Sequence, residues 1–362
     1  MRLLLALTLA IALTGQLRAG WLGGGNAKSA PSQPLTIMTW EDYLDPDLAS
    51  QFEKEANAKI QWIYFEDDSD RNAKLKEEGT MGVDLVLVGD KEFDLYRKRG
   101  WLAKLKPLQA PNLAQIDPRA FERFPDARGY GVPYLWGTTG IVYRKDLVKQ
   151  PITRWKQIFE PAPELRGLIQ MQSDPRELTA MALIALGHSP NSHDAAAYEA
   201  VNKLLVKQKP FVHDYSTLSL TEDSPLVKGE VVVAPAFNGD ALTLQGFQQN
   251  LEYVVPEEGG GFWMDFFVVM RLAKHQEMAH RFLDFINTPA VAAKNAQYLN
   301  YATPNKGALG LLPQEFRDNR TIFPDEATLK RCHAVETLPS WVKRQMANVA
   351  AEVLPVVEKG NE

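Results

Sequence analysis

The sequence predicts an α/β fold. Short runs of β-branched and apolar residues alternate with amphipathic stretches of helical periodicity along most of the chain, and this alternation is typical of sheets flanked by helices. The 362 residues are enough for two domains, since one domain usually takes about 100–200 residues. Apolar residues make up 45% of the chain and charged residues 23%, as in an ordinary globular protein.

The first part of the pattern predicts a mostly parallel sheet. Three short apolar runs are each followed by an amphipathic stretch. Parallel strands joined by right-handed crossovers share one edge at their carboxyl ends, and ligands bind at that edge. The expected strands are Leu35–Met38, Lys59–Tyr64 and Asp84–Val88, and the expected helices are Pro46–Asn57, Asp70–Gly79 and Phe93–Gly100.

A second set of elements follows. The expected strands are Gly140–Tyr143, Glu230–Ala234 and Phe262–Val269, and the expected helices are Pro175–Leu186, Ala195–Lys207, Lys274–Asn287 and Pro289–Tyr298. The strand at 262–269 is apolar except for Asp265. A carboxylate in such a strand costs about 2–7 kcal/mol or more unless it is paired or hydrogen-bonded. Asp265 is therefore the first residue to examine for a function.

The N-terminus has the form of a secretory signal peptide. Met1 and Arg2 precede an apolar run from Leu3 to Leu13, and Leu17-Arg18-Ala19 is an acceptable cleavage signal. We expect residues 1–19 to be the signal peptide and residues 20–34, which are rich in Gly, Ser and Pro, to be a flexible lead-in. The mature chain is then expected in the periplasm.

Charge and cysteine content exclude several classes. A net charge of −5 and a pI near 5.8 argue against nucleic acid as the main partner. The only cysteine is Cys332, so neither an intramolecular disulfide nor a multi-cysteine metal site can form. The thiol is either inert and partly buried or reactive. We expect no metal and no cofactor.

Acidic and aromatic residues gather where the expected strands end and helices begin. Such positions converge on a cleft in an α/β fold. The candidate ligand-binding residues are Trp40, Asp42, Tyr43, Asp174, Glu177, Phe237, Asp240, Trp263, Asp265 and Tyr301.

Each candidate also has a structural explanation. Asp174 can cap the helix that starts at Pro175, with Glu177 completing a capping box. Asp240 can cap a helix that starts at Ala241, and Asp42 can be a solvated loop acid. Aromatic residues taken one at a time are more often part of a core than of a binding site. Asp265 is the hardest to explain in this way because its neighbours are so apolar.

Enzyme motifs are absent from the sequence. It has no HExxH, GxSxG or P-loop pattern, and no GxGxxG follows a strand. Two carboxylates could serve acid–base hydrolysis, but this set combines several acids with several aromatic rings. Such a set suits an elongated cation with apolar spacers, because carboxylates pair with ammonium groups and rings contact methylene groups. Aliphatic polyamines are molecules of this kind.

The chain resembles the bacterial periplasmic polyamine-binding proteins, the spermidine- and putrescine-binding receptors of ABC importers. The resemblance runs from about residue 35 to about residue 324. It rests on the order and spacing of several stretches: "WEDYLDPDLASQFEKE", "DLVLV", "YGVPYLWGTTGIVYRKDLV", "SDPRELTAMALIALGHSPNS", "VKGEVVVA", "VPEEGGGFWMDFFVV" and "YATPNKGA".

The resemblance implies a two-lobed, hinged, monomeric receptor with the ligand between the lobes. The N-lobe is expected at 35–137 and 266–303, and the C-lobe at 138–265 and 304–362. Carried over by position, the aromatic residues wall the ligand and the acids hold its amines. Phe237 stands where many members have Trp. Lys91 departs from the family pattern, since it lies near an aromatic position of the family. Its cation would repel an amine unless Asp90 or Glu92 neutralises it.

Three functions follow from this reading. The first is a periplasmic receptor that captures a putrescine- or spermidine-like polyamine and delivers it to the permease of an ABC importer. The second is a polyamine-sensing module that docks on a membrane signalling protein. The third is a hydrolase that acts on a cationic substrate through two of the acids. The binding-protein readings are preferred, and the protein is not expected to be an enzyme.

Overall fold

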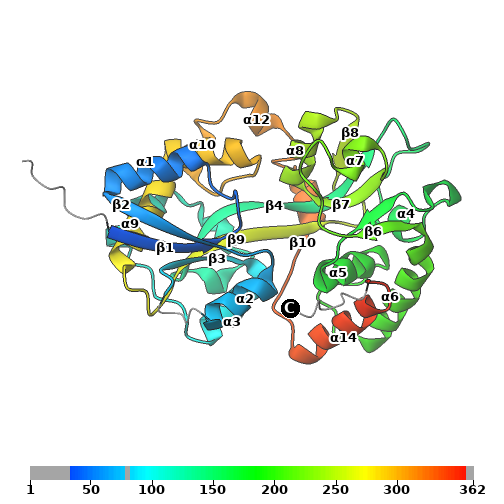
Figure 1. Cartoon of the computed structure of the whole chain (residues 1–362), viewed down its shortest axis with the longest axis horizontal. Coiled ribbons are helices and arrows are strands. Elements are labelled where there is room, and N and C mark those ends of the chain that lie inside the picture. Colours follow the sequence, from blue (N-terminus) through cyan, green and yellow to red (C-terminus); the bar gives the residue numbers. More distant parts are fainter. Residues whose placement is uncertain (1–32, 78–81, 356–362) are drawn as a thin grey trace, which may run out of the picture. The chain divides into compact units, whose positions relative to one another are not determined.

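The computed structural model describes residues 33–77 and 82–355. The expected signal peptide and lead-in lie outside these residues, except for Gln33 and Pro34, which open the first strand. The described strands form one continuous sheet in the order β2-β1-β3-β9-β4-β7-β5-β6, with β10 (His333–Ala334) beside β9 and β8 (Leu251–Val254) beside β4 (Figure 1).

One half of this sheet, here called the β1 half, confirms the alternating strands and helices expected from the sequence. Its strands are parallel to one another. Helix α3 begins earlier than expected, directly where β3 ends, and the predicted end of α2 at Gly79 lies outside the described residues. The elements are β1 (Gln33–Thr39), α1 (Pro46–Ala56), β2 (Ala58–Tyr64), α2 (Asp68–Glu77), β3 (Leu85–Gly89) and α3 (Asp90–Lys98).

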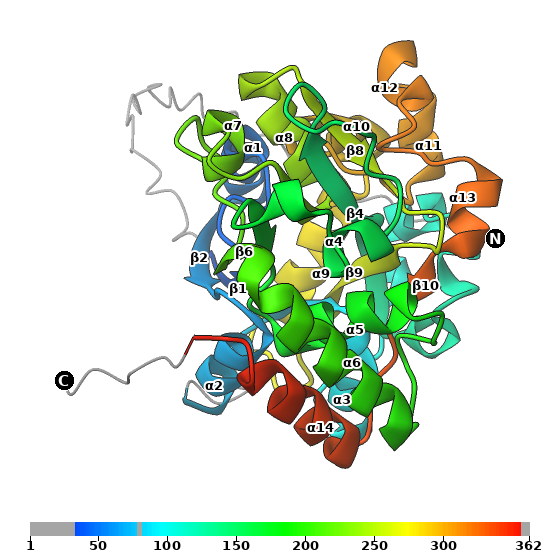
Figure 2. The same ribbon diagram turned by 90° about the vertical axis from the view of Figure 1, so that its right-hand side faces the viewer.

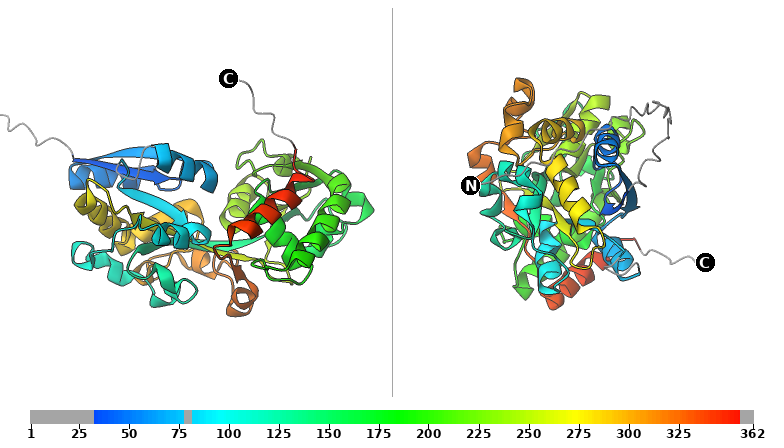
Figure 3. Two further views of the ribbon diagram at one scale, coloured as in Figure 1. Left: turned by 90° about the horizontal axis from the view of Figure 1, so that it is seen from below. Right: turned by 90° about the vertical axis from the view of Figure 1, so that its left-hand side faces the viewer.

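Two long antiparallel strands, β4 (Gly131–Arg144) and β9 (Gly261–Val269), form the middle of the sheet. The sequence predicted only the last part of β4, because Gly131, Pro133 and Gly137 weaken the strand pattern of the earlier part. β9 pairs with β3 through the residues from Asp265 onward, and β4 pairs with β7 through the residues from Thr139 onward. Figure 3 shows these strands running between the two groups of elements.

The other half of the sheet, here called the β7 half, was less well predicted. It contains β5 (Ile169–Met171), β6 (Val212–Tyr215) and β7 (Val233–Phe237). The strand predicted at Glu230–Ala234 begins and ends three residues too early, since β7 runs from Val233 to Phe237. The strand includes Pro235, which has no backbone N–H and usually marks a strand edge or end. The three-residue β5 and the polar β6 gave no strand pattern.

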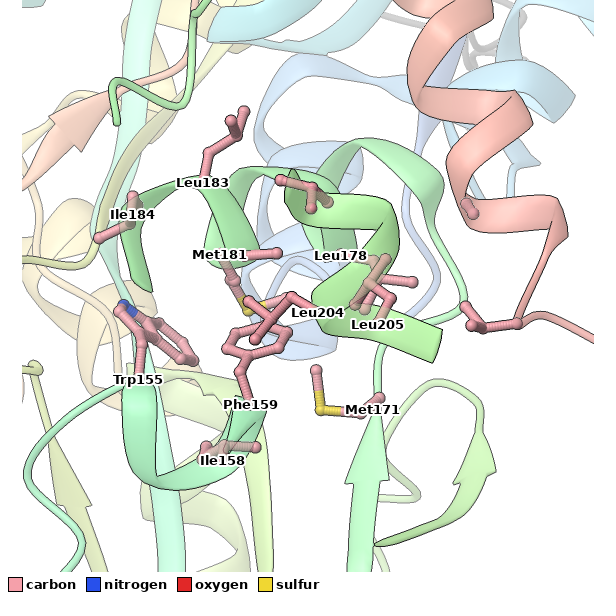
Figure 4. Close-up of a cluster of buried hydrophobic side chains, with 14 of the residues drawn as sticks. Trp155, Ile158, Phe159, Met171, Leu178, Met181, Leu183, Ile184, Leu204 and Leu205 are labelled. Atoms are coloured by element: carbon pink, nitrogen blue, oxygen red, sulfur yellow. The ribbon is translucent and has the colours of Figure 1, made fainter. Parts of the chain in front are cut away.

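The helices of the β7 half pack around Trp155, which is fully buried. Its indole Nε1 donates a hydrogen bond of 2.7 Å to the Gly259 carbonyl. Figure 4 shows the apolar side chains that surround this indole, and Figure 2 shows three of the helices side by side. The helices are α4 (Lys156–Phe159), α5 (Pro175–Ala185), α6 (Ala195–Gln208) and α14 (Ser340–Ala351).

The remaining helices include the two predicted at 274–287 and 289–298, which are confirmed as α9 and α10. Helix α11 and Leu312 after it pack on α10. These α-helices are α7 (Pro225–Lys228), α8 (Asn238–Phe247), α9 (Gln276–Ile286), α10 (Pro289–Leu299), α11 (Lys306–Leu309), α12 (Gln314–Asp318) and α13 (Glu326–Arg331). The short 3₁₀ helices are η1 (Pro107–Gln109), η2 (Pro111–Gln115), η3 (Pro118–Phe121), η4 (Pro125–Ala127), η5 (Pro163–Leu165) and η6 (Lys209–Phe211).

Cys332 is a free thiol within the fold. Its side chain is buried, and burial raises the pKa of the thiol. A thiol with a raised pKa is mostly protonated at neutral pH and reacts slowly. Across residues 33–77 and 82–355, no helix is both long and apolar enough to cross a bilayer.

Candidate functional site

Most of the predicted acids and aromatic residues lie at or just after strand ends of the two halves of the sheet. Trp40 follows β1, Asp174 follows β5, and Phe237 ends β7. Asp265 lies on β9, paired with Gly89 at the end of β3. The carboxyl ends of parallel strands form the usual ligand-binding edge of such sheets, and here two of these edges meet beside β9.

Asp265 is held by a tyrosine and forms no ion pair in the described part of the chain, although Arg71 and Lys91 are near enough to lower its pKa. The Tyr43 hydroxyl donates a hydrogen bond of 2.9 Å to its Oδ2 atom. Burial raises the pKa of the Asp265 carboxyl to about 6, although the hydrogen bond from Tyr43 opposes this shift. Within the described part of the chain, no Lys, Arg or His nitrogen lies within 4.0 Å of the carboxylate. The carboxylate thus lacks the counter-ion that a partly buried charge needs.

Asp240 repeats this arrangement on the other half. The Tyr301 hydroxyl donates a hydrogen bond of 2.8 Å to its Oδ1 atom, and burial raises the pKa of the carboxyl to about 6. No described basic side chain forms an ion pair with it. Helix α8 begins at Asn238 with Phe237 as its N-cap, so the prediction of a helix capped by Asp240 is wrong.

Aromatic rings connect the two acids. The rings of Tyr43 and Tyr301 lie 6.2 Å apart, edge to face. Trp263 contacts Tyr301 at 4.9 Å between ring centroids and Phe237 at 5.9 Å. The indole Nε1 of Trp263 is buried without a hydrogen-bond partner among the described residues. The two carboxylates are therefore connected through a group of packed aromatic rings that includes one unpaired donor, here called the aromatic wall.

Two glycines make room for these rings. A Cβ atom on Gly137 would lie 2.5 Å from Trp263 Cζ2, and one on Gly239 would lie 2.4 Å from Tyr301 Cε1. Both distances are shorter than any normal contact. The backbone of β4 and of α8 can approach the aromatic wall this closely only because both residues lack a side chain.

Asp174 and Glu177 lie at the start of α5. The prediction that Asp174 caps this helix is confirmed, since its Oδ1 accepts hydrogen bonds from the backbone N–H groups of Arg176 and Glu177. The capping-box role expected for Glu177 is wrong. Its Oε1 instead accepts a hydrogen bond of 3.3 Å from Lys91 Nζ on α3. One carboxylate of this pair therefore caps the helix while the other faces the β1 half.

Lys91 bridges the two halves through three acids, of which only Asp68 was not a candidate from the sequence. Its Nζ lies 3.2 Å from Asp68 Oδ2, 3.3 Å from Glu177 Oε1 and 3.8 Å from Asp174 Oδ2. Neither Asp90 nor Glu92, the two acids considered from the sequence, forms an ion pair with Lys91 among the described residues. The Asp90 carboxylate accepts the Lys91 backbone N–H, and Glu92 pairs with Lys343 at 2.8 Å.

Trp40 and Asp42 lie apart from the contacts that join the other candidates. Trp40 packs on Phe65 with ring centroids 4.4 Å apart. Asp42 is exposed, and together with Trp40 and Tyr43 it lines a cavity of about 300 Å³ against α1 and β2. No hydrogen bond or ion pair joins Asp42 to the other candidates in the described part of the chain. Its expected role at the ligand stays a prediction.

Sequence reasoning missed two acids. Asp68 opens α2 in an acidic run that follows Tyr64 and Phe65 at the end of β2, so the signal of acids and aromatic residues at a strand end was available. Asp90 was considered only as a partner of Lys91. Burial and, after it, the neighbouring Asp265 raise the pKa of Asp90 well above its ordinary value, and its Oδ2 has no described hydrogen-bond partner. Its position between an apolar strand and a helix start was the available signal.

The acids of this site do not form a metal centre. Among residues 33–77 and 82–355, no group of three or more His, Cys, Asp or Glu side chains has a geometry that could hold a metal ion. The two raised carboxyl pKa values resemble those of acid–base catalysts. Each carboxyl group, however, contacts a tyrosine hydroxyl and faces an aromatic wall, an arrangement that also suits the binding of a cation.

Known proteins share both the sequence and the fold. The bacterial extracellular solute-binding protein family matches residues 47–324. A spermidine/putrescine-binding periplasmic protein from Escherichia coli (strain K12) is 32% identical over 311 residues, which span 85% of this chain and 88% of that protein. A norspermidine sensor from Vibrio cholerae is 28% identical over 83% of both chains.

The structural comparison agrees. The structure of a spermidine/putrescine ABC transporter substrate-binding protein from Streptococcus pneumoniae aligns with a TM-score of 0.78 and 28% identity, and the alignment covers 89% of this chain and 98% of that chain. The two-lobed periplasmic binding protein fold expected from the sequence is confirmed. The described function of the matching family is solute binding rather than catalysis. The protein belongs to the bacterial extracellular solute-binding protein family, alongside the spermidine/putrescine-binding periplasmic proteins.

Proposed function

We propose that this protein captures a polyamine between two hinged lobes and delivers it to the permease of an ABC importer. The observation that carries the proposal is the pair of partly buried carboxylates, Asp240 and Asp265. Each is held by a tyrosine hydroxyl, and neither has a basic partner in the described part of the chain. The solute-binding relatives named above favour the same ligand class.

A polyamine supplies what this pair lacks. Its ammonium groups form charge-assisted hydrogen bonds with carboxylates, and these are the strong ones in proteins. Its methylene groups fit against the aromatic wall between the two acids, where Tyr301 contacts both Tyr43 and Trp263. Ring faces also attract the charged ends of the ligand. No chemical step is needed, because closure of the lobes buries the ligand and its binding energy stabilises the closed form.

We propose the expected lobe division with one change. Strands β4 and β9 are the first two crossings, near Gly137 and Asp265. Residues Ala308 and Leu312 pack on α10, which belongs to the proposed N-lobe. We therefore place the third crossing near β10 rather than directly after residue 303. Hinges of this kind usually consist of a few residues at the ends of elements.

The site of action proposed for the protein is the periplasm, after removal of residues 1–19. The Escherichia coli relative is itself a periplasmic protein. The partner proposed is an inner-membrane ABC permease, with the receptor acting as a monomer. Deletion of the gene is expected to abolish high-affinity uptake of radiolabelled polyamine, and uptake that is unchanged would remove the transport role.

Ligand binding itself is tested by thermal unfolding with putrescine, cadaverine, spermidine, norspermidine and spermine. A ligand that binds only the folded state stabilises it by about 2.7 kcal/mol at one hundred times its dissociation constant. We expect the melting temperature to rise with at least one of these amines and not with neutral 1,4-butanediol. No rise with any amine would refute the proposed function.

A sensing role is the second candidate, because the Vibrio cholerae relative is a norspermidine sensor. The ligand would be the same, but the protein would dock on a membrane signalling protein. The two roles predict different phenotypes of a deletion strain. A receptor for transport is needed for uptake, whereas a sensor is needed for the transcriptional response to external polyamine while uptake continues.

A further inference from the structure

We infer that Lys91 permanently occupies one of the cation positions of the site, so that the site accepts a diamine and discriminates against a triamine. This inference rests on the proposed function and deepens it. It begins from the three carboxylates around Lys91 Nζ, which come from α2 and from the start of α5. None of the three lies on the same helix as Lys91.

The geometry at Lys91 is that of a bound ammonium group. Its Nζ has acids on both sides, Asp68 from the β1 half and Glu177 from the β7 half. The side chain is only 24% exposed. Burial lowers the pKa of Lys91, but Asp68, Glu177 and Asp174 together raise it well above its ordinary value. Lys91 is therefore charged at neutral pH and satisfies these carboxylates without a ligand.

At the other end of the site, Asp265 and Asp240 form no ion pair with a basic side chain of the described residues. We call Glu177, Asp90, Asp265 and Asp240 the row of acids. Glu177 contacts Lys91, and Asp265 is near enough to Asp90 to raise its pKa. The ring contact between Tyr43 and Tyr301 then connects Asp265 to Asp240. Asp90 forms no ion pair either, but burial raises its pKa well above the ordinary value, and its Oδ1 accepts the Lys91 backbone N–H. Among the acids of the row, Asp265 and Asp240 are the two carboxylates that are held by a tyrosine hydroxyl and form no ion pair with a described residue. Two ammonium groups with an apolar spacer match two such positions.

The third ammonium group of a bound triamine would lie near the ammonium group of Lys91. Beyond Asp265, the row continues to the Lys91 cation, which is close enough to influence the pKa of Asp265. An extended triamine bound at Asp240 and Asp265 would direct its remaining charge toward this cation. Like charges brought together in a partly buried site destabilise a complex, and such repulsion is a common source of specificity.

Lys91→Met tests the inference. The substitution keeps the apolar stem and removes the charge, so that Glu177 and Asp174 become available to a third ammonium group. We expect the ratio of spermidine to putrescine affinity, measured by calorimetry, to rise by at least about tenfold relative to the unchanged protein. Adding Glu177→Gln to Lys91→Met should remove most of this gain, because the freed carboxylate is what binds the third charge.

Lys343→Met is the matched control. Lys343 on α14 also joins the two halves, through its 2.8 Å ion pair with Glu92 on α3, but it lies outside the row of acids. If Lys91 acted only as a latch between the halves, both lysine substitutions would change the affinities for all amines in the same way. We expect Lys343→Met to leave the spermidine-to-putrescine ratio unchanged.

The possible outcomes separate this inference from the proposed function. A ratio in Lys91→Met equal to that of the unchanged protein overturns the inference while polyamine binding stands. The same holds if the unchanged protein prefers spermidine to putrescine, a measurement that does not depend on the folding of any variant. Absence of binding to every amine in the unchanged protein would refute the proposed function and the inference together.

Discussion

Asp265→Asn is expected to weaken polyamine binding by about 2–5 kcal/mol, or roughly 30-fold to several thousand-fold. The substitution removes the charge that faces an ammonium group of the ligand but keeps the shape of the side chain. The amide can still accept the 2.9 Å hydrogen bond from Tyr43. The loss of affinity therefore measures the contribution of the charge pair between Asp265 and the ligand. Calorimetric titration with putrescine gives the change in dissociation constant.

The same substitution should not harm the fold. Burial raises the pKa of Asp265 from 3.8 to about 6. Keeping this carboxyl ionised at pH 7 in the ligand-free protein therefore costs at most about 3 kcal/mol. The side chain keeps some contact with solvent, which makes the true cost smaller. Asp265→Asn removes the cost, so urea unfolding without ligand should show equal or higher stability.

Asp223→Asn is the control for this prediction. Asp223 is 78% exposed and pairs with Lys228 on the surface. A neutral residue at this position should change putrescine affinity by less than about twofold. Equal affinity of Asp265→Asn and the unchanged protein would show that Asp265 is not in contact with the ligand. Weaker binding that is accompanied by lower stability would mean that the side chain has a structural role instead.

The sequence predicted the β1 half well because local patterns specify it. Each of its strands is a short apolar run, and α1 and α3 each have one apolar face, so the order of elements follows largely from periodicity. The β7 half depends more on tertiary pairing. Pro235 lies in β7 although proline has no N–H to donate, and the first part of β4 contains two glycines. Pairing between long neighbouring strands overcame the weak local preference at these residues.

One candidate for the site carried its own signal in the sequence. Asp265 is an acid inside an apolar strand, and its need for a partner is visible in the sequence. The surroundings of Lys91 are different. Its partner Glu177 lies 86 residues away in the sequence, and Asp68 belongs to another helix. Contacts of this kind depend on how the two halves of the sheet meet, and no local pattern contains that information.

The affinity for polyamine is expected to fall steeply below pH 6. Asp240 and Asp265 each have a pKa raised to about 6, so both are largely ionised at pH 7 and largely protonated at pH 5. If both must be ionised to bind, the dissociation constant for putrescine rises about 100-fold between pH 7 and pH 5. Near pH 6, binding should release protons, and calorimetry in two buffers of different ionisation enthalpy measures their number.

Stability without ligand should change in the opposite direction over the same range. A carboxyl group whose pKa is raised in the folded state binds protons more tightly there than in the unfolded chain. The contribution of Asp240 and Asp265 to stability therefore decreases as pH rises from about 4 to about 6. Ligand reverses this trend because its ammonium groups stabilise the ionised forms. Urea unfolding at pH 5 and pH 7, with and without putrescine, measures both effects.

Asp240→Asn separates the two carboxyl groups. The variant keeps an acceptor for the Tyr301 hydroxyl but cannot titrate, so one ionisation should remain in the binding equilibrium. The pH dependence of its affinity between pH 7 and pH 5 should shrink from about 100-fold to about tenfold, since each group with a pKa near 6 contributes about one factor of ten. A pH dependence equal to that of the unchanged protein would mean that Asp240 does not titrate with binding. The ammonium group would then have to pair with another acid of the row.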